Sequence, residues 1–107
     1  MWKNRSGQKL MIWARDSADA GVAGDAANIT AEISIDGGTS AATNDTNPTE
    51  LDATDHPGIY IFDLTQAETN GDVVVISPVS ATGTTIIEPV ISVVDRLPRA
   101  TRSFFRK

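Results

Sequence analysis

Residues 56–76 constrain the fold of this chain most, because they predict a turn, a strand, a capped turn and a second strand in immediate succession. Pro57-Gly58 predicts a turn, since proline fixes one backbone dihedral and glycine accepts positive φ. Residues 59–64 are β-branched, aromatic or apolar, which favours a pleated strand. Alternation along that strand places Tyr60, Phe62 and Leu64 on one face.

The residues after this strand predict a sharp corner. Thr65 and Glu68 have the spacing of a capping box, in which each side chain bonds to the other residue's backbone amide. Asn70-Gly71 then ends the turn, and residues 73–76 begin the next strand. We therefore expect one short helical turn near residues 65–70.

Three further segments have strand character. Residues 29–35 alternate apolar and polar side chains, and Asp36-Gly37-Gly38 after them predicts a hairpin turn. Residues 9–15 carry apolar side chains on both faces, and residues 73–77 are almost continuously apolar. Both patterns are typical of strands that are covered on both faces. Pro78 and Pro89 predict a bend, an edge or a bulge.

These strands predict an all-β fold, a single immunoglobulin-like antiparallel β-sandwich with extended terminal arms. A chain of 107 residues forms one domain. We expect an N-terminal arm over residues 1–8, a sandwich over 9–95 and a basic C-terminal arm over 96–107. The connection over residues 44–58 is predicted to be irregular, with Leu51 holding it to the body.

The charges are segregated along the chain, whose net charge is −5. Every lysine and arginine lies at or before Arg15 or at or after Arg96, and every acid lies between Asp16 and Asp95. An acidic body repels nucleic acid, so basic ends next to it favour an acidic protein surface, such as that of a neighbouring copy.

The two basic ends also contain aromatic residues without a local packing pattern, Trp2 in the first and Phe104 and Phe105 in the second. Nucleic-acid binding, membrane binding and docking on a protein are three readings of such a composition. We favour protein docking, with no nucleic acid and no membrane as partners. The predicted docking residues are Trp2, Arg5, Arg96, Arg99, Arg102, Phe104, Phe105 and Arg106.

The sequence contains no recognisable catalytic motif, so we predict no enzyme activity and no cofactor. His56 is the single histidine, and there is no cysteine. His56 is expected to be an exposed turn residue rather than a catalytic base. The acidic loop with Asp45, Glu50, Asp52 and Asp55 lacks the spacing of a calcium loop, and calcium binding there stays open. No apolar run has the ~20 residues of a membrane span.

A family resemblance adds to this interpretation. Two segments carry it: Gly24-Asp25-Ala26-Ala27-Asn28-Ile29-Thr30-Ala31 with Asp36-Gly37-Gly38, and Pro57-Gly58-Ile59-Tyr60-Ile61-Phe62-Asp63-Leu64-Thr65 with Glu68-Thr69-Asn70. They resemble small structural proteins of tailed bacteriophages, over about residues 9–93. The resemblance implies a non-enzymatic virion component, assembled in the host cytoplasm, whose partners are other virion proteins and copies of itself.

The sequence leaves the position in the particle open. We expect attachment at the tail, the head–tail junction or a fibre base, with capsid decoration as an alternative. A carbohydrate-binding module for the host surface is a further alternative, in which Trp2, Trp13 and Tyr60 would stack on sugars.

Overall fold

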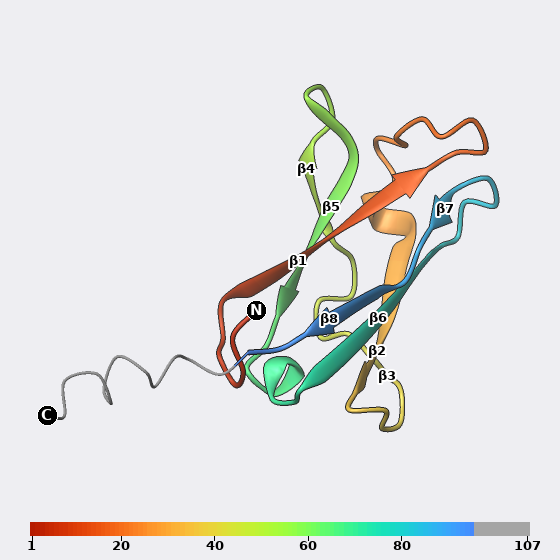
Figure 1. Ribbon diagram of the computed structural model, residues 1–107. Helices are drawn as coiled ribbons and strands as arrows, with labels where there is room; N and C mark the ends of the chain where they lie inside the picture. The colour runs from red at the N-terminus through yellow and green to blue at the C-terminus, as the bar shows by residue number, and fades with distance from the viewer. Residues whose placement is uncertain (96–107) are drawn as a thin grey trace, which may run out of the picture.

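The computed structural model describes residues 1–95 and shows two four-stranded antiparallel sheets packed as a sandwich (Figure 1). The predicted all-β sandwich is therefore confirmed. One sheet has the strand order β4-β5-β1-β7 and the other the order β3-β2-β6-β8. The strands are β1 (Gln8–Arg15), β2 (Ile29–Ile35), β3 (Ala41–Ala42), β4 (Thr49–Asp52), β5 (His56–Leu64), β6 (Val73–Ser80), β7 (Ile86–Ile87) and β8 (Val90–Val93). Two 3-10 turns, η1 (Ala26–Asn28) and η2 (Ala67–Thr69), complete the elements.

The strand order is that of an immunoglobulin sandwich. With β1, β4 and β5 as strands B, D and E, and with β2, β6 and β8 as C, F and G, the connections follow that scheme. The short strand β7 pairs with Ala14 and Arg15 at the end of β1, where strand A would pair in an immunoglobulin domain. The side of β1 away from β5 has no partner strand over Gln8–Trp13 among residues 1–95.

The core lies between the two sheets and is built from the inward rows that alternation predicted. Leu10, Ile12 and Ala14 of β1 are buried, as are Tyr60, Phe62 and Leu64 of β5. The opposite sheet contributes Ile29, Ala31, Ile33, Val74 and Ile76. Each large apolar side chain buried in this way stabilises the fold by about 1.5–3 kcal/mol.

The corner between β5 and β6 is formed as the capping box predicts. The Glu68 amide donates to Thr65 Oγ1 at 3.3 Å, and the Thr65 amide donates to Glu68 Oε1 at 2.8 Å. The second carboxylate oxygen of Glu68 accepts from the Asn44 amide at 3.1 Å. The buried Glu68 thus holds both its own turn and the segment after β3.

The turn after β2 has positive φ at two successive residues, 52° at Asp36 and 74° at Gly37, and the Gly38 amide donates to the Ile35 carbonyl at 2.9 Å. These are the dihedrals of a type I′ turn, which suits a twisted hairpin. Asp36 Oδ1 also accepts from the amides of Asp72 and Val73, at 2.8 and 2.9 Å. The turn therefore fixes the start of β6 as well as the hairpin.

The two strand prolines have different effects. Around Pro89 the chain passes from one sheet to the other, because β7 belongs to one sheet and β8 to the other. At Pro78 the strand does not end, and β6 continues to Ser80. The Asp72 carbonyl accepts from the Val94 amide, so the backbone groups of Asp72 point toward β8. Alternation gives residue 78 the same direction, and β8 no longer pairs with β6 beyond Ile76. No ladder hydrogen bond is lost there.

The connection over residues 44–58 is more regular than predicted. β4 pairs with β5, and β5 already begins at His56, before the expected Pro57-Gly58 turn. Leu51 is exposed, so the prediction that it holds this segment to the body is wrong. Register pairing with β5, shifted between Glu50 and Asp52, positions the segment instead.

Candidate protein-binding surface

The outer face of the β3-β2-β6-β8 sheet carries a block of four β-branched side chains, which we call the valine block: Val73, Val75, Ile91 and Val93. Val73 lies opposite Val93 and Val75 lies opposite Ile91, so the four side chains are neighbours across two strands. Ile91 is 70% exposed and Val93 is 68% exposed. The valine block contains no charged side chain.

The outer face of the other sheet carries a second apolar block, the Trp13 block: Met11, Trp13, Ile59 and Ile61. Met11 pairs with Ile61 and Trp13 with Ile59 across β1 and β5. Met11 is 54% exposed and Trp13 is 44% exposed. One rung further along, Lys9 pairs with Asp63 and closes the block with an exposed ion pair.

These two blocks show that the predicted cover on both faces of strands 9–15 and 73–77 is wrong for the described residues. Within residues 1–95 each strand is covered on its core face only. Single apolar side chains at a surface are common, but neighbouring ones that form a patch indicate a binding surface.

A groove opens between the two sheets where β1 and β8 lie near each other without pairing. Its volume is about 450 Å³. Its lining contains both apolar and polar residues: Met1, Trp2, Gln8, Lys9, Leu10, Met11, Val90 and Ser92. We call the groove and the two strand edges beside it the open side.

The N-terminal segment lies against the sandwich at the open side. Trp2 forms a parallel bridge with Asp95, and the Asn4 amide donates to the Thr69 carbonyl at 2.9 Å. The Arg5 amide donates to Thr69 Oγ1 at 2.9 Å, and Thr69 Oγ1 donates to the Arg5 carbonyl at 3.0 Å. The expected arm over residues 1–8 is therefore bound along its length, with the Trp2 and Arg5 side chains exposed.

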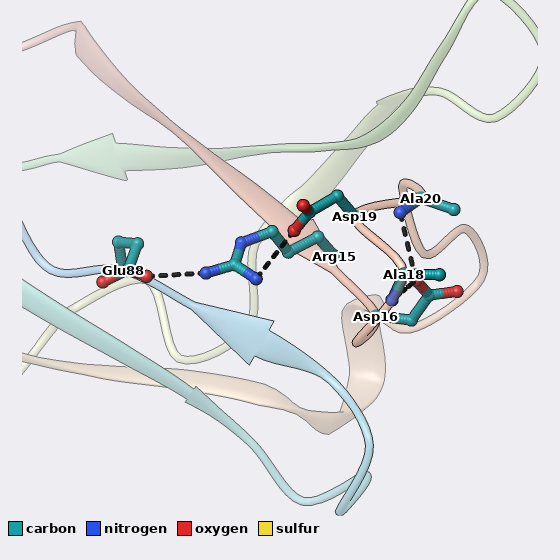
Figure 2. A network of polar contacts seen from close by, with 6 residues as sticks. All are labelled: Arg15, Asp16, Ala18, Asp19, Ala20 and Glu88. Atoms are coloured by element: carbon teal, nitrogen blue, oxygen red, sulfur yellow. Dashed lines mark hydrogen bonds and ion pairs between the residues drawn. The ribbon is translucent and has the colours of Figure 1, made fainter.

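Most basic side chains before Asp16 pair with acids of the same chain. Lys3 contacts Asp72 at 3.1 Å. Arg15 binds Asp19 at 3.0 Å and Glu88 at 2.8 Å, joining the turn after β1 to the connection between β7 and β8 (Figure 2). Exposed pairs of this kind contribute 0 to about 1 kcal/mol each. Arg5 forms no ion pair with any residue in the described part of the chain.

The other predicted docking residues fall outside the described range. They are Arg96, Arg99, Arg102, Phe104, Phe105 and Arg106. Of the predicted set, the structure therefore places Trp2, which lines the groove, and Arg5, which is bound nearby.

A buried polar centre at Asp25 escaped the sequence analysis. The Asp25 carboxylate accepts hydrogen bonds from four side chains: Ser80 at 2.6 Å, Thr82 at 2.7 Å, Asn28 at 2.9 Å and Thr85 at 3.1 Å. Burial raises the pKa of Asp25, but these hydrogen bonds outweigh that effect and hold the pKa below its ordinary value of 3.8.

Tyr60 connects this centre to the other sheet. Its hydroxyl donates to the Val22 carbonyl at 2.7 Å and accepts from the Asp25 amide at 2.9 Å. Desolvation raises the pKa of Tyr60, so the phenol keeps its proton. Every donor at this centre has a protein acceptor, which makes it a structural site. Local spacing shows only Asn28 near Asp25; its other partners are distant in the sequence.

The remaining candidate residues have ordinary structural roles. His56 is exposed, as expected, but it is the first residue of β5 rather than a turn residue. Glu50 accepts from the Gly24 amide, Asp52 accepts from the amides of Thr54 and Asp55, and Asp45 accepts from the Asp63 amide. No three His, Cys, Asp or Glu side chains within residues 1–95 are grouped to hold a metal ion.

The sugar-stacking platform does not form. Tyr60 is fully buried in the core, so its ring cannot meet a ligand together with Trp2 and Trp13. Among the described residues no helix is long and apolar enough to cross a membrane. Comparisons with protein-family models, with curated proteins and with solved structures find no match for this chain.

Proposed function

We propose that this protein is a non-enzymatic structural subunit of a bacteriophage virion, which binds neighbouring virion proteins through the outer faces of its sandwich. The observation that carries the proposal is the pair of apolar blocks on opposite sheets. The resemblance of residues 9–93 to phage structural proteins is the reason that we propose a virion as the assembly.

The arrangement suits a subunit that contacts more than one neighbour. The valine block and the Trp13 block belong to different sheets and face away from each other, so one partner can cover only one of them. Apolar side chains of this kind are typical of the desolvated centre of an interface. The exposed ion pairs Lys9–Asp63 and Lys3–Asp72 lie beside them as polar rims.

Incorporation into particles tests the proposal. A tagged chain is expressed during infection by the phage that encodes it, particles are purified on a density gradient, and the tag is quantified. We expect the unmodified chain to travel with the particles. Ile91→Glu with Val93→Glu should reduce incorporation about ten-fold or more, because two carboxylates would be desolvated in the contact.

Thr30→Glu is the matched control, since Thr30 is exposed on the outer face of the same sheet, on β2. This variant should be incorporated like the unmodified chain. The absence of the unmodified chain from particles, or equal incorporation of the double glutamate variant, contradicts the proposal. Copy number separates the two locations: about a dozen or fewer copies for a ring at the tail or neck, and hundreds for capsid decoration.

A further inference from the structure

The edge of β8 differs from those of the terminal strands β3, β4 and β7. β3 and β7 are edge strands of two residues each, and β4 carries Glu50 and Asp52. Short length and charge are the usual protections of an edge strand against pairing with another chain. β8 has four residues, Val90–Val93, with neither charge nor proline among them.

The backbone of this edge points outward at two residues. The Val94 amide bonds inward to the Asp72 carbonyl, whereas the Asp95 amide bonds outward to the Met1 carbonyl. Because alternate residues of a strand direct their amides and carbonyls to opposite sides, Ile91 and Val93 direct theirs outward. Within residues 1–95 no strand pairs with them there.

The N-terminal segment pairs with the chain just beyond this edge, at Asp95. The Lys3 amide donates to the Asp95 carbonyl at 2.6 Å, which completes the parallel bridge between Trp2 and Asp95. The segment stops there, and the groove continues beside Val90 and Ser92 toward Leu10 and Met11 of β1. An extended peptide in this groove would gain main-chain hydrogen bonds to β8 and apolar contacts to β1.

We propose that residues 99–107 of a second copy bind this groove as an added strand along β8. This refines the proposed function by naming one partner and one site. Residues 96–107 hold five of the nine basic side chains and none of the fourteen acidic ones, so they complement the acidic body. In an extended conformation Thr101, Ser103 and Phe105 share one face, and only the ends of that row, Arg99 and Lys107, are charged, so its centre suits an apolar groove.

Two acidic residues, Glu88 and Asp95, lie on either side of the β8 edge. Asp95 lies just after the edge and forms no ion pair with the described residues, whereas Glu88, before the edge, already pairs with Arg15. By alternation Arg102 and Arg106 lie on the row opposite Phe105, and in the proposed complex they would pair with carboxylates near the edge. A second copy is the donor because Trp2 already occupies the edge beside Asp95, which blocks a tight hairpin of the same chain back along β8.

Disulfide trapping between two differently tagged full-length chains tests this docking, since the protein has no cysteine of its own. One chain carries Ser92→Cys in the groove and the other carries Ser103→Cys. The control replaces the first variant by Ser17→Cys, an exposed serine outside the groove. All three changes are nearly isosteric.

We expect roughly ten-fold more linked two-chain product from the Ser92→Cys mixture than from the Ser17→Cys mixture, because docking raises the effective concentration of the two thiols. Equal linking of both mixtures overturns the proposal. A chain carrying both Ser92→Cys and Ser103→Cys that closes internally, with no linked mixture, overturns the second copy as donor. Purified protein suffices, so failure here is distinguishable from failure to enter particles.

Discussion

The Asp25 centre and the open side differ in how many of their polar groups have hydrogen-bond partners within the fold. At the Asp25 centre one carboxylate accepts from four side chains, and Tyr60 joins the two sheets through Val22 and Asp25. At the open side β1 and β8 leave backbone edges without a partner strand in residues 1–95, beside a groove of about 450 Å³. One region satisfies its polar groups within the fold, and the other leaves strand edges and a groove exposed.

This contrast separates stability from association. A change near the Asp25 centre should lower the free energy of unfolding, because buried groups would lose partners or space. A change on the outer face near the open side should leave that free energy almost unaltered, since water already contacts these side chains. Partner binding should be weakened more by a change on the outer face near the open side than by a change near the Asp25 centre.

The largest effect is expected for Gly58→Ala, close to the Asp25 centre. Gly58 has a φ of 88°, and a Cβ there would collide with the backbone carbonyl oxygen of Ala14. Strain and collision together should cost about 3 kcal/mol or more of unfolding free energy, measured by urea denaturation. Gly83→Ala is the control, because a Cβ at Gly83 meets nothing within 4 Å. If Gly58→Ala lost as little unfolding free energy as Gly83→Ala, residue 58 would tolerate a side chain.

An intermediate effect is expected for acidification and for Asp25→Asn. Hydrogen bonds hold the pKa of Asp25 below 3.8 in the folded state, so the unfolded chain binds this proton first as the pH falls. The stabilisation is complete above the unfolded pKa and is lost as the pH drops through the folded value. At neutral pH Asp25→Asn should be about 1–2 kcal/mol less stable than the unmodified protein, since charge-assisted bonds become neutral ones.

The difference between the two proteins should shrink as the pH falls below 3.8, because the unfolded chain then binds a proton that folded Asp25 binds only at lower pH. Denaturation curves at several pH values measure it. Backbone hydrogen bonds also lower the pKa of Asp36, first from Val73 and then from Asp72, so both proteins keep some acid sensitivity. A difference that stays constant from neutral to acid pH would mean that ionised Asp25 does not stabilise the fold.

The smallest effect on stability is expected for Val93→Thr in the valine block. Val93 is 68% exposed, and threonine keeps the β-branched shape that suits a strand. The free energy of unfolding should change by at most about 0.5 kcal/mol. A loss of 2 kcal/mol in the monomer would mean that the outer face is covered by the chain itself, and the contrast between the two regions would disappear.

Local sequence patterns determined much of the fold. Alternation in residues 29–35 and 59–64 placed the inward rows, the Thr65–Glu68 spacing produced the capping box, and Asp36-Gly37-Gly38 formed the hairpin turn. Each of these features depends on residues within a few positions of one another. Their side chains and backbone can satisfy each other before distant segments meet.

Only the tertiary structure decided the rest. Asp25 and Ser80 are 55 positions apart, and their contact exists because η1 and the end of β6 meet at one end of the sandwich. Apolar side chains on both faces of residues 9–15 and 73–77 predicted cover on both sides, yet the structure of residues 1–95 covers one. Periodicity reports which faces are apolar, whereas long-range packing decides which of them the chain itself buries and which stay exposed.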